Sequence, residues 1–349
     1  MIIPSVSRRD FLRLAALSVT GLAVRGLNPC LSLDFTNGSS FLRSNGRVTH
    51  RFVYVYAQPD EKSQRLDRLE RDSLVEIEEV VTGAAGPVYN PRWYRLQGGY
   101  VHSAYVQPLP GVCLNLPLAQ VPETGLLGEI TVPYSQSYYT NRKGEWLPLY
   151  RLYYDSLHWI TGVWVDISGQ EWYQLVDEWL KIVYHVPAAH VHSIPDTEWK
   201  PLSPDIPGDD KSIEVSLEDQ TVTAFEAGHA VFSAQVATGK RYMETPKGEF
   251  TINRKLPSKH MGNGALTNRI GAFELPGVPW VCFFHTNGVS FHGTYWHDNF
   301  GTPMSQGCVN MRCKDALWLF RWCNPVFPEK ITSQKGWLVK GKGTKVRVY

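Results

Sequence analysis

The sequence predicts a mainly β protein: two small barrels followed by a larger β-rich domain with one main helix. Three observations support this. Short runs of alternating apolar and polar residues, bounded by turn residues, recur from residue 49 to the end of the chain. One block of these runs occurs twice. Only residues 315–323 have the composition of a clear helix. A chain of 349 residues is long enough for two or three domains.

Residues 1–30 are typical of an export signal. The twin-arginine pattern Ser7-Arg8-Arg9-Asp10-Phe11-Leu12 precedes an apolar run over residues 14–24. This run is too short to cross roughly 30 Å of hydrocarbon as a stable helix, but it suits a signal peptide. We therefore expect export by the twin-arginine route to the periplasm or cell wall, with membrane attachment only through this segment. The alternative is a short amphipathic helix. The formal net charge of +2 does not indicate a nucleic-acid partner.

Residues 49–110 and 127–196 repeat one pattern, which predicts an internal duplication. Asp72-Ser73-Leu74 corresponds to Asp155-Ser156-Leu157, and Trp93-Tyr94-Arg95-Leu96 corresponds to Trp172-Tyr173-Gln174-Leu175. Each copy then ends in a closing segment, which aligns Tyr105 with His190. The pattern resembles bacterial SH3-like domains, a resemblance that implies two small barrels of the kind that accompany cell-wall enzymes. A proline-rich linker is expected over residues 197–210.

The third part, residues 211–349, opens with a predicted β-meander. Residues 213–217, 221–225 and 230–236 alternate in character and are separated by short turns. Residues 315–323 are rich in helix formers, and Pro325 ends the predicted helix. Residues 345–349 are expected to form a final strand.

Near the end of the third part, a thiol and an imidazole occur at a spacing that suits nucleophilic catalysis. Cys308 lies in Ser305-Gln306-Gly307-Cys308-Val309-Asn310, sixteen residues after His292. A nearby imidazole makes the reactive thiolate available near neutral pH. Gly307 allows close approach of a bound carbonyl, so the N–H groups of Gly307 and Cys308 are candidate oxyanion donors. The carbonyl of Gly293 is placed to fix the imidazole tautomer.

These motifs resemble the L,D-transpeptidase (YkuD-type) family, whose pattern is His, a gap, then Ser/Thr-x-Gly-Cys-x-Asn/Arg. Further matches upstream are Thr238-Gly239 and Thr245-Pro246-Lys247-Gly248-Glu249-Phe250, together with Gln220 after the first turn of the meander. The resemblance covers residues 211–349. It implies a β-rich catalytic domain that forms peptidoglycan cross-links and needs neither metal nor other cofactor.

The resemblance also implies roles for individual residues. Cys308 matches the nucleophile, His292 the general base, and the Gly293 carbonyl the partner that orients the base. The expected contacts to peptidoglycan stem peptides come from Thr294, Ser305, Gln306, Gly307 and Asn310. Many family members carry a second histidine where this chain has Gln306. Because Gln306 does not titrate, His292 is expected to transfer the proton unaided.

Several other interpretations remain open at the level of sequence. They are an L,D-carboxypeptidase, another cysteine peptidase, a non-catalytic peptidoglycan-binding protein, and a zinc site built from His292, His297, Cys308 and Cys313. The spacing of that last set is not typical of structural zinc sites. Cys282 is expected in the core, and Cys313 near a helix start, where it replaces a polar cap. The other histidines, His260, His285 and His297, are expected on exposed loops.

Overall fold

The computed structural model describes residues 44–83 and 90–349. The predicted twin-arginine segment at 1–30 lies outside the described residues. Within them, the chain is mainly β, and α2 (Cys313–Trp322) is the one α-helix. None of the described helices has the length and apolar character that crossing a membrane requires.

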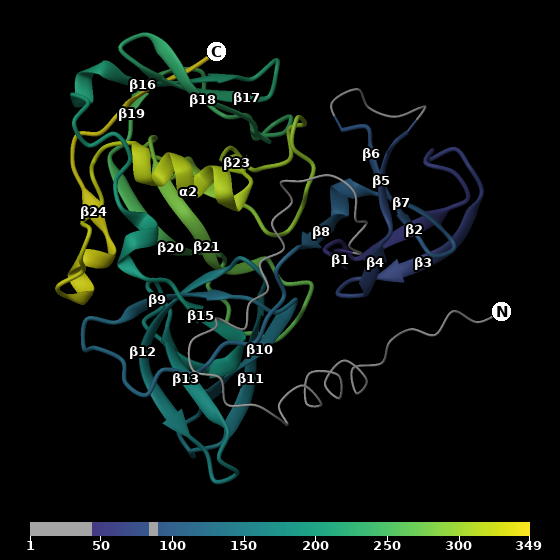
Figure 1. The fold of residues 1–349 in the computed structure, drawn as a ribbon, viewed down its shortest axis with the longest axis vertical. Coiled ribbons are helices and arrows are strands. Elements are labelled where there is room, and N and C mark those ends of the chain that lie inside the picture. Colours follow the sequence, from purple (N-terminus) through teal and green to yellow (C-terminus); the bar gives the residue numbers. More distant parts are fainter. Residues whose placement is uncertain (1–43, 84–89) are drawn as a thin grey trace, which may run out of the picture.

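Among its described residues, the first unit contains eight strands in two sheets (Figure 1). The smaller sheet has the order β4-β1-β8 and the larger one the order β3-β2-β7-β6-β5. Its strands are β1 (Ser44–Val48), β2 (Phe52–Tyr56), β3 (Arg65–Glu70), β4 (Leu74–Ile77), β5 (Glu79–Thr82), β6 (Arg92–Leu96), β7 (Gly99–His102) and β8 (Val106–Leu109). Strands β6 and β7 form an antiparallel hairpin whose turn contains Gly98.

The second unit is one seven-stranded sheet with the order β11-β10-β14-β13-β12-β9-β15. Its strands are β9 (Leu126–Ile130), β10 (Tyr134–Thr140), β11 (Trp146–Tyr153), β12 (Leu157–Val165), β13 (Glu171–Val176), β14 (Val183–Pro187) and β15 (Val191–Ser193).

The two units share local geometry at the positions that the sequence pattern aligns. Asp72 and Asp155 both adopt a left-handed backbone, with φ of 65° and 67°, a conformation that Asp tolerates better than most residues. Tyr105 ends the short 3-10 turn η1 (Ser103–Tyr105), and His190 ends the equivalent turn η2 (Ala188–His190). The assignment of either unit as an SH3-like barrel stays a prediction.

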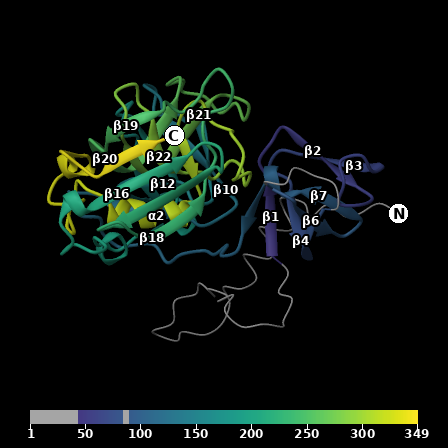
Figure 2. The ribbon, with the colours of Figure 1, turned by 90° about the horizontal axis from the view of Figure 1, so that it is seen from above.

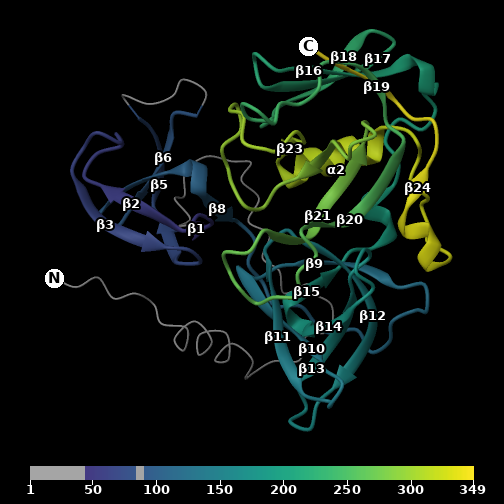
Figure 3. The same ribbon diagram turned by 180° about the vertical axis from the view of Figure 1, so that it is seen from behind.

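The third part has two five-stranded sheets with α2 packed between them (Figures 1 and 3). Their orders are β18-β17-β16-β25-β19 and β23-β22-β21-β20-β24. Trp318 of α2 stacks on Phe232 of the first sheet, and Phe320 packs against Trp280 of the second. The strands are β16 (Lys211–Ser216), β17 (Thr221–Glu226), β18 (His229–Gln235), β19 (Gly248–Thr251), β20 (Arg254–Gly262), β21 (Glu274–Phe283), β22 (Ser290–Gly293), β23 (Val309–Met311), β24 (Val339–Lys340) and β25 (Lys345–Val348).

Most predicted elements of this part lie where the sequence places them. The predicted meander is β16–β17–β18, paired antiparallel in order. The helix begins two residues earlier than predicted, at Cys313, and Arg312 is its N-cap. The interpretation of Cys313 as a cap is therefore wrong. The segment 197–210 contains two short 3-10 turns, η3 (Asp196–Trp199) and η4 (Gly208–Asp210), and Trp199 is buried.

The two N-terminal units contact the third part in different ways (Figure 2). Leu127, Leu157 and Trp159 of the second unit belong to the main hydrophobic core of the third part. Trp159 stacks on Trp337 with ring centroids 4.3 Å apart. The first unit has its own small core, and its contacts to the third part include polar ones such as the ion pair between Arg92 and Asp298.

Candidate active site

Cys308 and His292 come together because their strands are parallel neighbours. His292 lies on β22, and Cys308 immediately precedes β23. The register pairs His292 with Asn310, so Cys308 lies one residue before the strand that runs beside the histidine. The short strand β23 comes between Cys308 and α2, and it pairs with β22.

The environment of Cys308 favours its thiolate. The side chain is partly exposed, so a substrate can reach it. Burial raises the pKa of the Cys308 thiol, but interactions with His292 and then with Ser290 outweigh burial and lower that pKa overall. The Ser290 Oγ lies 3.6 Å from the Cys308 Sγ. A partly exposed cysteine with a lowered pKa has the properties of a nucleophile.

The other described cysteines in the third part lack this combination. Burial raises the pKa of Cys282, and burial with the charges of Asp155 and Glu129 raises that of Cys313. Cys323 has a pKa lowered to about 7 through Cys282 and Lys255, although burial opposes this shift. It is buried, so substrate cannot reach it. Cys282 lies in the core, as the sequence predicts.

His292 is held in one orientation by its own strand. Its Nδ1 lies 3.0 Å from the Gly293 carbonyl oxygen. Because a carbonyl only accepts hydrogen bonds, this contact assigns the proton to Nδ1 and leaves Nε2 as the basic nitrogen. The Trp296 ring lies against the imidazole, with centroids 5.7 Å apart. The side chain is 2% exposed.

Gly293 is a site of close approach. A Cβ atom at this position would lie 2.7 Å from Pro279 Cγ and 3.1 Å from Cys313 Cα. The carbonyl that orients His292 therefore belongs to a residue that must be glycine for steric reasons.

A network of hydrogen bonds shapes the loop before Cys308. Ser305 Oγ donates to the Cys308 carbonyl and accepts from Gly307 N–H at 3.1 Å. Gly307 has φ of +116°, a conformation that favours glycine. Its N–H already has a partner in Ser305, which leaves the N–H of Cys308 as the stronger candidate for the oxyanion donor.

The upstream motifs support this loop from the other sheet. Gln220 accepts from Thr238 N–H at 2.9 Å and donates to Thr238 Oγ1 at 2.8 Å. The Thr238 carbonyl in turn accepts from Ser305 N–H at 3.0 Å. Thr245 Oγ1 donates to the Gly307 carbonyl at 2.8 Å and accepts from Gly239 N–H. These residues, far apart in sequence, position the segment that carries the thiol.

The remaining predicted substrate contacts differ in accessibility. Gln306 is exposed. Asn310 is buried, and its amide donates to His297 Nε2 at 2.8 Å. Its role in the site is therefore structural support. Thr294 is buried, and its backbone contacts the Cys313 side chain. The structure thus brings Ser305, Gln306 and Gly307 around the thiol, with Asn310 and Thr294 in supporting positions.

Two expectations about histidines are wrong, and one residue of the site is missed by the sequence reasoning. His260 and His297 are buried, at 2% and 5% exposure, although exposed loops are expected. Each has polar partners that make burial tolerable. Ser290 touches the thiol and is missing from the predicted set. A signal exists, because Ser290 precedes His292 by two residues and alternate residues of a strand face the same side.

The described residues include no group of three or more His, Cys, Asp or Glu side chains that could hold a metal ion. Within the set considered for zinc, His297 is engaged with Asn310, and Cys313 lies beside Asp155.

Known proteins match the part of the chain that carries this site. Residues 210–348 match the family model of the L,D-transpeptidase (YkuD) catalytic domain. A curated Bacillus licheniformis protein named as the L,D-transpeptidase YkuD is 31% identical over 107 residues, which cover 31% of this chain and 56% of the relative. The chain thus spans about half the length of that relative.

Solved structures of similar proteins include the catalytic domain of an Enterococcus faecium L,D-transpeptidase, at 24% identity and a TM-score of 0.30. The similarity covers 40% of this chain and 98% of that one. An L,D-transpeptidase from Mycobacterium smegmatis is 17% identical with a TM-score of 0.33, over 53% of this chain and 79% of that one. The family model and the curated relative thus agree that residues 210–348 are similar to the L,D-transpeptidase (YkuD) catalytic domain.

Proposed function

We propose that this protein is a peptidoglycan L,D-transpeptidase that forms cross-links through a thioester on Cys308. The observation that carries the proposal is the partly exposed Cys308, whose pKa His292 lowers against the effect of burial. This thiol lies inside the region that matches the family.

In the first step, His292 Nε2 takes the proton of the Cys308 thiol, and the resulting thiolate attacks the carbonyl at the L-centre of the diamino acid in a tetrapeptide stem. The Cys308 N–H stabilises the negative charge that develops on the carbonyl oxygen. The C–N bond to the terminal D-Ala breaks, and D-Ala leaves with a proton delivered by His292 Nε2. The product is a thioester between the tripeptide and Cys308.

In the second step, an amine of a neighbouring stem attacks the thioester. His292 Nε2 accepts the proton that this amine loses, a new amide bond forms, and Cys308 leaves as the thiolate. Throughout, the Gly293 carbonyl keeps the Nδ1 proton in place. If water replaces the amine, the same site releases a free tripeptide and acts as an L,D-carboxypeptidase.

The remaining parts of the chain suggest where this reaction takes place. The twin-arginine pattern supports export to the periplasm or cell wall, because peptidoglycan is built outside the cytoplasmic membrane. The two N-terminal units are proposed as SH3-like modules that keep the catalytic domain near its substrate.

Incubation with a disaccharide tetrapeptide, followed by mass spectrometry, tests the proposal. Cross-linked dimers are expected from the wild type and none from Cys308→Ala. Tripeptide alone would identify a carboxypeptidase. If neither product forms and the protein still pellets with isolated cell wall, the chain is a binding protein.

A further inference from the structure

A cavity of about 390 Å³ lies where the first unit, the second unit and the third part meet. Thr49, just after β1, contributes from the first unit, and Tyr150 and Arg151 of β11 contribute from the second. The connection over residues 267–276 and the segment around Trp296 close it from the third part. Figure 3 shows these three parts converging.

Two of the residues that line this cavity carry a buried hydroxyl group without a partner. Thr49 Oγ1 and the Tyr150 hydroxyl have no hydrogen-bond partner among the described residues, and their side chains are 6% and 2% exposed. Arg151 Nε, at the same wall, is also buried and unpartnered. Burying polar groups without hydrogen-bond partners is unfavourable. Their concentration around one cavity therefore points to a ligand that would supply the missing partners.

The charge of the cavity favours an anionic ligand. Four arginines line it, namely Arg47, Arg71, Arg151 and Arg269, against one carboxylate, Glu274. Asp72 pairs with Arg47 and Arg151 from outside the lining. Glu274 is itself occupied, because it contacts His260 Nε2 at 2.9 Å and accepts from the N–H of Ala265 at 2.9 Å. A carboxylate suits such a site because arginine and hydroxyl groups donate to it readily.

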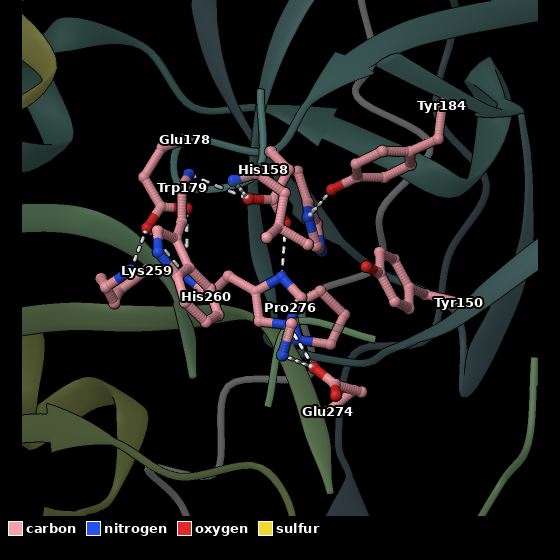
Figure 4. Close-up of polar contacts among 12 residues, drawn as sticks. Tyr150, His158, Glu178, Trp179, Tyr184, Lys259, His260, Glu274 and Pro276 are labelled. Carbon is pink, nitrogen blue, oxygen red and sulfur yellow. Dashed lines mark hydrogen bonds and ion pairs between the residues drawn. The ribbon is translucent and has the colours of Figure 1, made fainter. Parts of the chain in front are cut away.

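One wall of the cavity is fixed by a buried polar cluster between the second unit and the third part (Figure 4). His260 lies between Asp177 of the second unit and Glu274. The Tyr150 ring packs edge-on against the His260 ring, with centroids 5.3 Å apart. Burial, with the charges of Asp177 and Glu274, raises the pKa of Tyr150. Its hydroxyl therefore stays protonated and able to donate.

The cavity adjoins the thiol site through the side chains of Trp296 and His297. Trp296 lines the cavity and also lies against His292. His297, which accepts a hydrogen bond from the Asn310 amide, also lines the cavity. The cavity and the reacting imidazole are therefore neighbours across the Trp296 ring.

We propose that this cavity is a subsite for a carboxylate-bearing segment of the stem peptide, with Thr49, Tyr150 and Arg151 as its recognition residues. The inference rests on the proposed function, because it identifies the ligand as substrate. It gives the two N-terminal units a direct part in substrate binding.

Titration calorimetry with the disaccharide tetrapeptide tests the subsite separately from the chemistry. The parent protein is the full chain with Cys308→Ala, which binds but does not turn over. Thr49→Val and Tyr150→Phe are then added singly, each removing one unpartnered hydroxyl at nearly constant shape. Thr302→Val is the matched control, because Thr302 Oγ1 is also buried and unpartnered but lies outside the lining.

We expect Thr49→Val and Tyr150→Phe each to weaken binding by about fivefold to tenfold, with unchanged thermal unfolding and no effect of Thr302→Val. A tetrapeptide with its carboxylates converted to amides should bind weakly and equally to all variants. Equal affinity of the parent and both cavity variants for the unmodified peptide overturns the inference. Failure of the proposed function is recognised separately, because the wild type then forms no product whatever the calorimetry shows.

Discussion

The thiol site and the cavity lie on opposite sides of Trp296 and are built differently. Around Cys308, polar groups such as Ser305 Oγ, Gln220 and Thr245 Oγ1 are satisfied within the third part. In the cavity, Thr49 Oγ1 and the Tyr150 hydroxyl are unpartnered, and the walls come from all three parts. On the proposed function, the third part alone holds a preorganised reaction centre, whereas the proposed substrate binding depends on how all three parts pack together.

The largest expected effect is that of Cys308→Ala, which should abolish the reaction at the thiol site without changing binding in the cavity. Cys308→Ala should reduce cross-linking by on the order of 10³-fold or more, because nothing else in the site can form the thioester. Binding of the tetrapeptide should persist, since the cavity is untouched. Product assays and calorimetry on the same preparation check both halves. Cys282→Ala is the control: it removes a core thiol and should lower thermal stability while leaving the chemistry in place.

His292→Ala should reduce the rate by about 10²- to 10⁴-fold, the usual contribution of a positioned general base. Without the imidazole, burial dominates and raises the pKa of Cys308. The pH at which iodoacetamide alkylates the thiol at half its maximal rate should therefore rise by about one unit or more. An unchanged pH profile would show that His292 does not activate Cys308.

Gly293→Ala tests the steric fixation of the site. The new methyl group would meet Pro279 and Cys313, so β22 must shift. We expect a loss of about 1–3 kcal/mol in stability and about tenfold in rate through displacement of His292. Gly162→Ala is a matched strand control, because its Cβ would have its closest contact at an ordinary 3.5 Å. Equal behaviour of the two variants would contradict the steric argument.

The smallest expected effect is a pH dependence of the cluster that fixes the cavity wall. Burial lowers the pKa of His260, but Asp177 and Glu274 outweigh it and raise that pKa overall. A raised pKa means that the stabilisation is complete below the unfolded value and is lost as pH rises through the folded value.

Burial also raises the pKa of Asp177, but its contact with His260 outweighs this and lowers the pKa. The Asp177 contribution is therefore lost as pH falls through the folded value of that carboxyl. Between about pH 6 and pH 9, Tm should fall by roughly 2–4 °C more in the wild type than in His260→Gln, which cannot titrate. An equal fall in Tm in the wild type and in His260→Gln would show that His260 does not cause the pH dependence.

The comparison also explains how much the sequence could predict. The meander, the helix, and the pairing of His292 with Cys308 follow from periodicity and from motifs within one domain. Strand β23 was missed because three residues carry too little periodicity to register. Ser290 can be predicted, because it precedes His292 by two residues and alternate residues of a strand face the same side.

The cavity could not be predicted from the sequence. Its walls join Thr49, Tyr150 and Trp296, which are distant in the chain and have no motif in common. The burial of His260 depends on Asp177, which is 83 residues away. An isolated histidine between polar residues gives no sign of a carboxylate partner contributed by another unit.

The central claim is that Cys308 carries the acyl group, and the most direct test is to trap that intermediate. The wild-type protein is mixed with the tetrapeptide, quenched in acid within the first turnovers, digested, and mapped by mass spectrometry. We predict a mass increase equal to the tripeptide acyl group on the peptide that contains Cys308, together with release of D-Ala. An adduct on a different residue, or cross-linking by Cys308→Ala at the wild-type rate, would contradict the account.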